Sequence, residues 1–127
     1  MFATQQIEAY RRTQKVSMSG REIEASVLTQ AALKLLACQD RWGTEGHENR
    51  LNEALRFNQL IWSIFQTELA KPENPLPKNI KEDLLSLSAF IDKRIFEIMA
   101  FPESDKLTIL ININLNIAAG LRGADKD

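Results

Sequence analysis

The chain has few of the residues on which enzymes and metal sites most often depend. Its 127 residues include one cysteine, Cys38, and one histidine, His47. A zinc site needs several thiolate or imidazole ligands and an internal disulfide needs two cysteines, so neither is expected. There is no glycine-rich phosphate loop and no helical pair of histidines. We therefore expect no enzymatic activity, no cofactor and no metal.

Neither sign of charge predominates, and long apolar runs are scarce. Sixteen Lys and Arg residues against 17 Asp and Glu residues give a formal net charge of -1, which argues against direct binding to nucleic acid through phosphate attraction. Residues 1–16 are polar and lack the apolar core of a secretory signal. The longest apolar run, residues 107–121, is interrupted by asparagines and is too short to span a bilayer. With a single cysteine, these features favour a cytoplasmic protein without membrane association.

Helical periodicity is the strongest pattern in the sequence, and it is clearest in residues 48–70. Apolar residues recur there every three or four positions, which places them on one face of a helix. Asn58 falls on the same face, where a hydrophobic residue is expected. The helix should end before Pro72, because proline lacks the amide hydrogen and disfavours helical geometry in the residue before it. The apolar face comprises Leu51, Leu55, Trp62, Phe65 and Leu69.

A second helix is predicted before this one. Ser19 and Glu22 form a capping box that marks its start, and its apolar face comprises Ile23, Val27, Ala31, Leu35 and Cys38. On that face Cys38 is expected to be a small core residue and not a nucleophile. Residues 42–49, with Gly43 and Gly46, should form the connection to the next helix, where His47 is expected to be solvated.

A third long helix is predicted from the prolines at residues 72–77 to the residues before Phe101 and Pro102. Its apolar face comprises Ile80, Leu84, Leu87, Ile91, Ile95 and Ile98.

Residues 107–121 have an ambiguous pattern. Isoleucine and leucine alternate with asparagine, which is typical of a half-buried strand. No other segment offers a strand to pair with, so we favour a helix, with Ser104 as its cap and Gly120 or Gly123 as its end. In a helix, Thr108, Asn112 and Asn116 form a polar edge and Asn114 lies on the apolar face.

These elements predict one domain over residues 1–127, an all-α, antiparallel, up-and-down helical bundle of about four main helices with a short N-terminal helix. Residues 1–18 include the basic residues Arg11, Arg12 and Lys15 and have few apolar residues. A short helix of this kind is marginal alone. It is expected to be a mobile segment that docks on the body or folds on a partner.

The asparagines on the two apolar faces have two interpretations. Asn58 and Asn114 either bond to each other or to a backbone carbonyl and fix the register of two helices, or offer amides to a peptide in a groove. Trp62 and Phe65 are likewise either core residues or part of a groove for an amphipathic helix. The candidate partner-binding residues are Tyr10, Arg11, Asn58, Trp62, Phe65, Leu110, Asn114, Ile117 and Leu121.

Several short stretches stand out for their order and spacing along the chain. They are Tyr10, SGREIE at 19–24, ALRFNQLIW at 54–62, PENPLP at 72–77, LININ at 110–114 and AGL at 119–121. Together they resemble the bacterial flagellar biosynthesis protein FlaF family, and the resemblance spans nearly the whole chain. One departure is Leu115, where an arginine is expected after the asparagine, so no shared polar role is expected there.

The resemblance implies a small cytoplasmic factor that binds flagellin and promotes its synthesis or export in a chaperone-like way. Flagellin has amphipathic terminal helices that polymerise through their apolar faces, and a helical bundle can cover such a face. The resemblance equally implies an alternative, a post-transcriptional regulator of flagellin mRNA that acts with an FlbT-like protein. A third interpretation is a self-associating helical adaptor, a weak homodimer that buries the apolar face of residues 107–121.

Overall fold

A computed structural model gives the structure of the protein, and it describes residues 20–124. The predicted N-terminal helix, the capping residue Ser19 and the candidate site residues Tyr10 and Arg11 lie outside the described residues.

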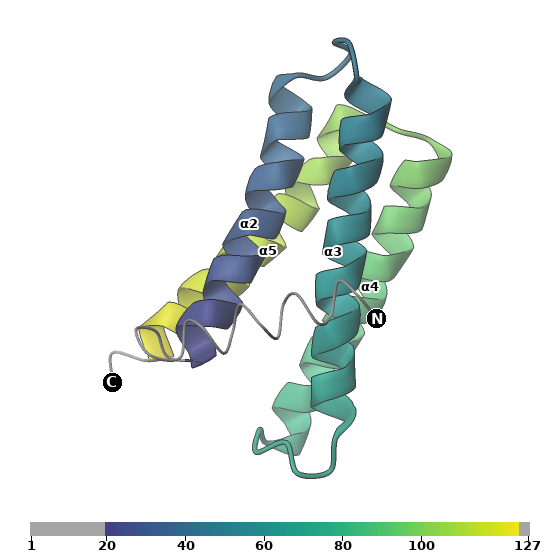
Figure 1. Cartoon of the computed structure of the whole chain (residues 1–127). Helices are drawn as coiled ribbons and strands as arrows, with labels where there is room; N and C mark the ends of the chain where they lie inside the picture. The colour runs from purple at the N-terminus through teal and green to yellow at the C-terminus, as the bar shows by residue number, and fades with distance from the viewer. Residues whose placement is uncertain (1–19, 125–127) are drawn as a thin grey trace.

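The described chain is a bundle of four helices. They are α2 (Gly20–Asp40), α3 (His47–Ala70), α4 (Lys78–Ala100) and α5 (Leu107–Ala124), and a short 3-10 turn, η1 (Ser104–Lys106), leads into α5. Successive helices run in opposite directions (Figure 1). The predicted all-α, up-and-down bundle is therefore confirmed, and residues 20–124 contain no strand.

The four helices form two pairs. α5 packs mainly on α2, α4 packs on α3, and contacts between α2 and α3 join the pairs. In Figure 1 the pairs are close at the end where the α2–α3 connection lies and diverge toward the opposite end, where residues 71–77 link α3 to α4. Where the pairs diverge, apolar residues of one pair are not covered by the helices of the other pair.

The core contains the faces predicted from periodicity. Ala31 and Ala32 are buried on α2, and their small side chains allow a neighbouring helix to approach closely. Cys38 is buried as a core residue, as predicted. The largest fully buried apolar side chains are Trp62, Ile23, Leu28, Leu35, Leu55, Ile61, Ile91, Ile95, Ile98, Leu107 and Leu110.

The apolar face of α4 is buried over only half of its length, which the sequence did not predict. Ile91, Ile95 and Ile98 are buried, whereas Leu84 is half-buried and Ile80 is 40% exposed. The cause is the packing of α5 on α2, because α5 does not run along the first turns of α4. These turns therefore present apolar side chains at the surface.

The helical interpretation of residues 107–121 is confirmed, but its predicted ends are wrong. Ser104 opens η1, and its carbonyl accepts a 3.0 Å hydrogen bond from Gln39 Nε2. At the other end the helix continues through Gly120 and Gly123 to Ala124. Arg122 explains this extension, because it bonds to Thr29 Oγ1 at 3.1 Å and lies 3.8 Å from a Glu22 carboxylate oxygen, both on α2.

The α2–α3 connection is stabilised by one arginine. Gly43 and Gly46 have φ angles of 77° and 81°, which only glycine adopts readily, so the predicted breakers are confirmed. Arg50 donates hydrogen bonds to the carbonyls of Glu45 and Arg41 at 2.6 and 3.1 Å. The prediction of a solvated His47 is wrong, because its ring is half-buried and lies edge-on to Trp42 with centroids 4.2 Å apart.

Candidate functional site: an apolar pocket beside a buried asparagine network

Two asparagines and one tryptophan form a hydrogen-bonded network inside the bundle. The Nε1–H group of Trp62 on α3 donates to Asn114 Oδ1 on α5 at 2.9 Å. Asn114 Nδ2 donates to Asn58 Oδ1 at 2.6 Å, and Asn58 lies on α3 like Trp62. Asn58 Nδ2 then donates to the carbonyls of Ala31, on α2, and Ala54, at 3.2 and 2.9 Å. The network therefore connects three helices.

This network confirms the structural interpretation of the two asparagines. Asn58 and Asn114 are each 1% exposed and Trp62 is 2% exposed, so water cannot replace their mutual hydrogen bonds. A shift of α5 by one residue along α3 would leave buried amides without partners. We conclude that the network fixes the register of α5 against α2 and α3.

Trp62 also forms one wall of an apolar pocket, which lies where the two helix pairs diverge. Beside it on α3, Phe65 packs edge-on with ring centroids 5.8 Å apart, and Leu69 follows one turn later. Ile117 and Leu121 line the pocket from α5. All five residues lie on faces that the sequence marked as apolar, and all but Leu69 were candidate site residues.

The opposite wall comes from three other elements. Leu28 belongs to α2, Leu76 to the turn between α3 and α4, and Leu84 to the uncovered first half of α4. The pocket has a volume of about 130 Å³. A cavity of about 150 Å³ lined by aliphatic and aromatic residues accepts a benzene ring, so this pocket has room for one large apolar side chain.

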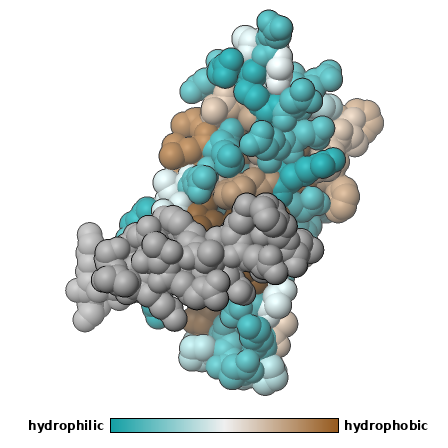
Figure 2. Space-filling view, viewed as in Figure 1, coloured by the Kyte–Doolittle hydropathy of each residue, from teal (hydrophilic) through white to brown (hydrophobic). Residues whose placement is uncertain are grey.

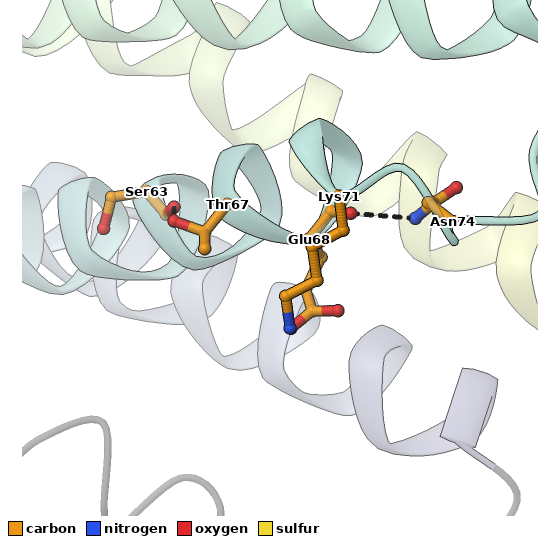
Figure 3. Close-up of polar contacts among 5 residues, drawn as sticks. All are labelled: Ser63, Thr67, Glu68, Lys71 and Asn74. Carbon is orange, nitrogen blue, oxygen red and sulfur yellow. Dashed lines mark hydrogen bonds and ion pairs between the residues drawn. The ribbon is translucent and has the colours of Figure 1, made fainter.

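The turn that carries Leu76 is held by Asn74 (Figure 3). Its Nδ2 donates to the carbonyl of Glu68 at 3.1 Å, at the end of α3, and its Oδ1 accepts the backbone amide of Leu76 at 3.0 Å. The side chain thus satisfies a helix-end carbonyl and closes an Asx turn. This arrangement directs the chain after α3 so that Leu76 lies on the pocket.

The polar residues that line the pocket are Glu24, Glu68 and Asn74. The carboxylate of Glu68 lies 3.0 Å from Lys71 Nζ, and both side chains are about half exposed. The pocket therefore combines an apolar interior with an acidic and amide edge, as expected where one partner side chain is inserted and its neighbours remain hydrated. Figure 2 shows that the visible described surface is mainly hydrophilic, with hydrophobic residues emerging in separate patches.

The structure divides the candidate site residues into two groups. Asn58, Leu110 and Asn114 are buried in the core and do not line the pocket. Trp62 is buried and also lines the pocket, and it is joined there by the half-buried Phe65, Ile117 and Leu121. Trp62 is therefore a core residue that also lines a pocket, and the binding of an amphipathic helix there stays a prediction.

Sequence reasoning missed the residues that close the pocket. Leu28, Leu76 and Leu84 were assigned to helices or to the turn, because periodicity does not reveal where two helix pairs diverge. Asn74 had a detectable signal, since an asparagine two residues before an apolar residue in a proline-rich turn favours an Asx turn.

The apolar face of α5 that was proposed to pair two copies of the chain is largely used within the chain. Leu107, Leu110, Ile111 and Ala118 are buried, and α5 packs mainly on α2. Elsewhere among the described residues, the phenylalanines with the highest exposed fractions are Phe96 and Phe101, at 62% and 73%.

The described residues were expected to provide neither a metal site nor a reactive thiol. Among them, no three His, Cys, Asp or Glu side chains gather into a group that could hold a metal ion. Burial raises the pKa of the Cys38 thiol, assisted by Glu53 and opposed by Arg50 and Lys34, so the thiol is protonated at neutral pH. Within residues 20–124, none of the helices combines the length and the apolar character needed to cross a bilayer.

Comparison with known protein families gives one match. The family described as flagellar protein FlaF matches residues 6–121, which is nearly the whole chain. No curated protein and no solved structure matches the chain.

Proposed function

The chain belongs to the FlaF family of flagellar proteins, and from this premise we propose that it is a non-enzymatic cytoplasmic factor that binds flagellin. Binding would promote the synthesis or export of flagellin in a chaperone-like way. The observation that supports this proposal most strongly is the apolar pocket between the two helix pairs.

The pocket suits the insertion of one large apolar side chain from an amphipathic helix. Most of its lining residues lie on helices, and Trp62 is held by a buried hydrogen bond, so little conformational entropy is lost when a partner binds. Ile80 is exposed on the first turn of α4, one turn before the pocket residue Leu84, and extends the apolar surface beyond the pocket. A helix whose apolar face repeats every three or four residues can contact both regions.

Flagellin supplies helices of this kind at its termini. Before assembly these helices expose apolar faces that would otherwise associate, and a partner that covers one face keeps the subunit competent for export. The proposed role is therefore transient protection of one flagellin helix, without a chemical reaction.

The test is to mix the purified full-length protein with monomeric flagellin and measure molar masses by size exclusion with light scattering. A complex of defined stoichiometry at tens of micromolar, reproduced with a peptide of one terminal flagellin helix, is the expected result. The protein alone on the same column reports any homodimer. Separate elution of both proteins would contradict flagellin binding and would favour the alternative role with an FlbT-like regulator of flagellin mRNA.

A further inference from the structure

The described part of the chain begins beside the apolar pocket. α2 begins at Gly20, and Glu24, which lines the pocket, lies one helical turn further along, about 6 Å away. Tyr10 lies ten positions before Gly20, a span of about 15 Å if helical and about 33 Å if extended. Both spans exceed the distance from Gly20 to Glu24, so a turn between Tyr10 and Gly20 is enough to bring Tyr10 to the pocket.

The sequence of residues 1–19 has the chemistry that the pocket accepts. In a helix Ile7 and Tyr10 would share one side, and tyrosine combines a large apolar ring with a hydroxyl that can remain at a polar edge. The ionisable residues among those lining the pocket are Glu24 and Glu68, of which Glu68 is paired with Lys71, whereas residues 1–19 carry three cations and one acid. The cations are Arg11, Arg12 and Lys15. Charge and apolar character are thus complementary between the two.

The family match gives an independent reason to treat these residues as part of the domain. It begins at residue 6, fourteen positions before α2 begins at Gly20. The shared domain therefore includes a stretch preceding the four described helices.

We propose that residues 6–16, with Tyr10 as the inserted side chain, occupy the apolar pocket when no partner is bound, and that a partner helix must displace them. This inference rests on the proposed function only for the identity of the partner. A tethered segment acts at a high effective concentration, so even a weak intrinsic contact keeps the pocket occupied. If the segment fills the pocket for about nine-tenths of the time, the apparent affinity for a partner falls about tenfold.

Occupation is tested by disulfide trapping in the full-length chain, with the buried native thiol removed by Cys38→Ala. Ala9→Cys, which keeps Tyr10 as the inserted side chain, is combined with Leu84→Cys, on the pocket, or with the matched control Leu85→Cys, its exposed neighbour on α4. Mild oxidation should close the disulfide between positions 9 and 84 at least tenfold faster than the one between positions 9 and 85, measured on non-reducing gels. Equal rates would overturn the proposal that the segment occupies the pocket.

Displacement is tested with Ile7→Asp combined with Tyr10→Asp in the full-length chain, titrated with flagellin. We expect flagellin to bind about tenfold more tightly than to the natural sequence. If the disulfide to position 84 forms preferentially but this variant binds flagellin with unchanged or weaker affinity, residues 6–16 do not compete with flagellin, and that part of the proposal is overturned. If no variant binds flagellin at all, the proposed function fails, whereas the trapping experiment still decides whether residues 6–16 occupy the pocket.

Discussion

Trp62 on α3 and Asn114 on α5 are joined by a buried 2.9 Å hydrogen bond from the indole Nε1–H to the amide oxygen. The same indole ring lines the apolar pocket. One side chain therefore couples the register of the bundle to the shape of the proposed binding site.

Replacing Trp62 by phenylalanine should remove this coupling. Trp62→Phe keeps an aromatic ring but leaves the buried Asn114 oxygen without its donor, which costs about 1–3 kcal/mol in the free energy of unfolding. The larger truncation Trp62→Ala should cost about 3–5 kcal/mol, as for other core aromatics. Urea unfolding measures both, and Trp42→Phe on the half-buried Trp42 is the control. A loss for Trp62→Phe no larger than that of the control would contradict the role of the hydrogen bond.

The asparagine pair should behave as one unit. Asn58→Leu leaves the buried Nδ2 group of Asn114 without its acceptor, and Asn114→Leu leaves Asn58 Oδ1 and the Trp62 Nε1–H group without partners. Each substitution should therefore lower the free energy of unfolding by about 1–3 kcal/mol. The double variant should lose less than the sum of the two single losses, by at least about 0.5 kcal/mol. A double-mutant cycle from chemical denaturation gives this coupling energy. Strict additivity would show that the two amides act independently.

The turn after α3 should depend on Asn74. Asn74→Ala removes the bonds to the Glu68 carbonyl and the Leu76 amide, which together should stabilise the turn by about 1 kcal/mol. Flagellin binding should also weaken, because Leu76 lines the pocket. The matched control is Asn79→Ala, at an exposed position in the first turn of α4. Similar effects of both substitutions on unfolding and binding would argue against a positioned turn.

Cys38 should make stability depend on pH in the alkaline range. Its pKa is raised above the ordinary value of 9.0, mainly by burial, so above pH 9 the folded chain holds a proton that the unfolded chain releases. Stability should therefore be unaffected by this thiol below pH 9 and should fall as pH rises from 9 toward the raised pKa. Comparison of unfolding curves for the natural sequence and Cys38→Ala isolates the effect. An identical alkaline decline in both proteins would exclude Cys38 as its cause.

The sequence predicted helices well because helical periodicity is local. The faces of α2 and α3 and the helical state of residues 107–121 follow from spacing and from the lack of a strand to pair with. The pairing of Asn58 with Asn114, 56 residues apart, was also predictable, because both are polar residues on faces that must be buried.

The pocket could not be predicted in the same way. It depends on α5 packing along α2, which leaves the first turns of α4 uncovered, and on the angle between the two pairs. Local spacing assigns Leu84 and Ile91 to the same face, yet one is half-buried at the pocket and the other is in the core. The extension of α5 past Gly120 likewise depends on a tertiary contact, the bond from Arg122 to Thr29.

The most direct test of the central claim compares flagellin binding by two neighbouring variants, Leu84→Asp and Leu85→Asp. Leu84 lines the pocket, whereas Leu85 is exposed outside it. The two substitutions therefore place the same charge on the same turn of α4, but only Leu84→Asp places it in the pocket. Circular dichroism first establishes that both variants fold, and isothermal titration calorimetry then gives the dissociation constants for monomeric flagellin. The pocket account predicts at least about a tenfold loss, roughly 1.4 kcal/mol, for Leu84→Asp and little change for Leu85→Asp. Equal affinities of the two folded variants would contradict it.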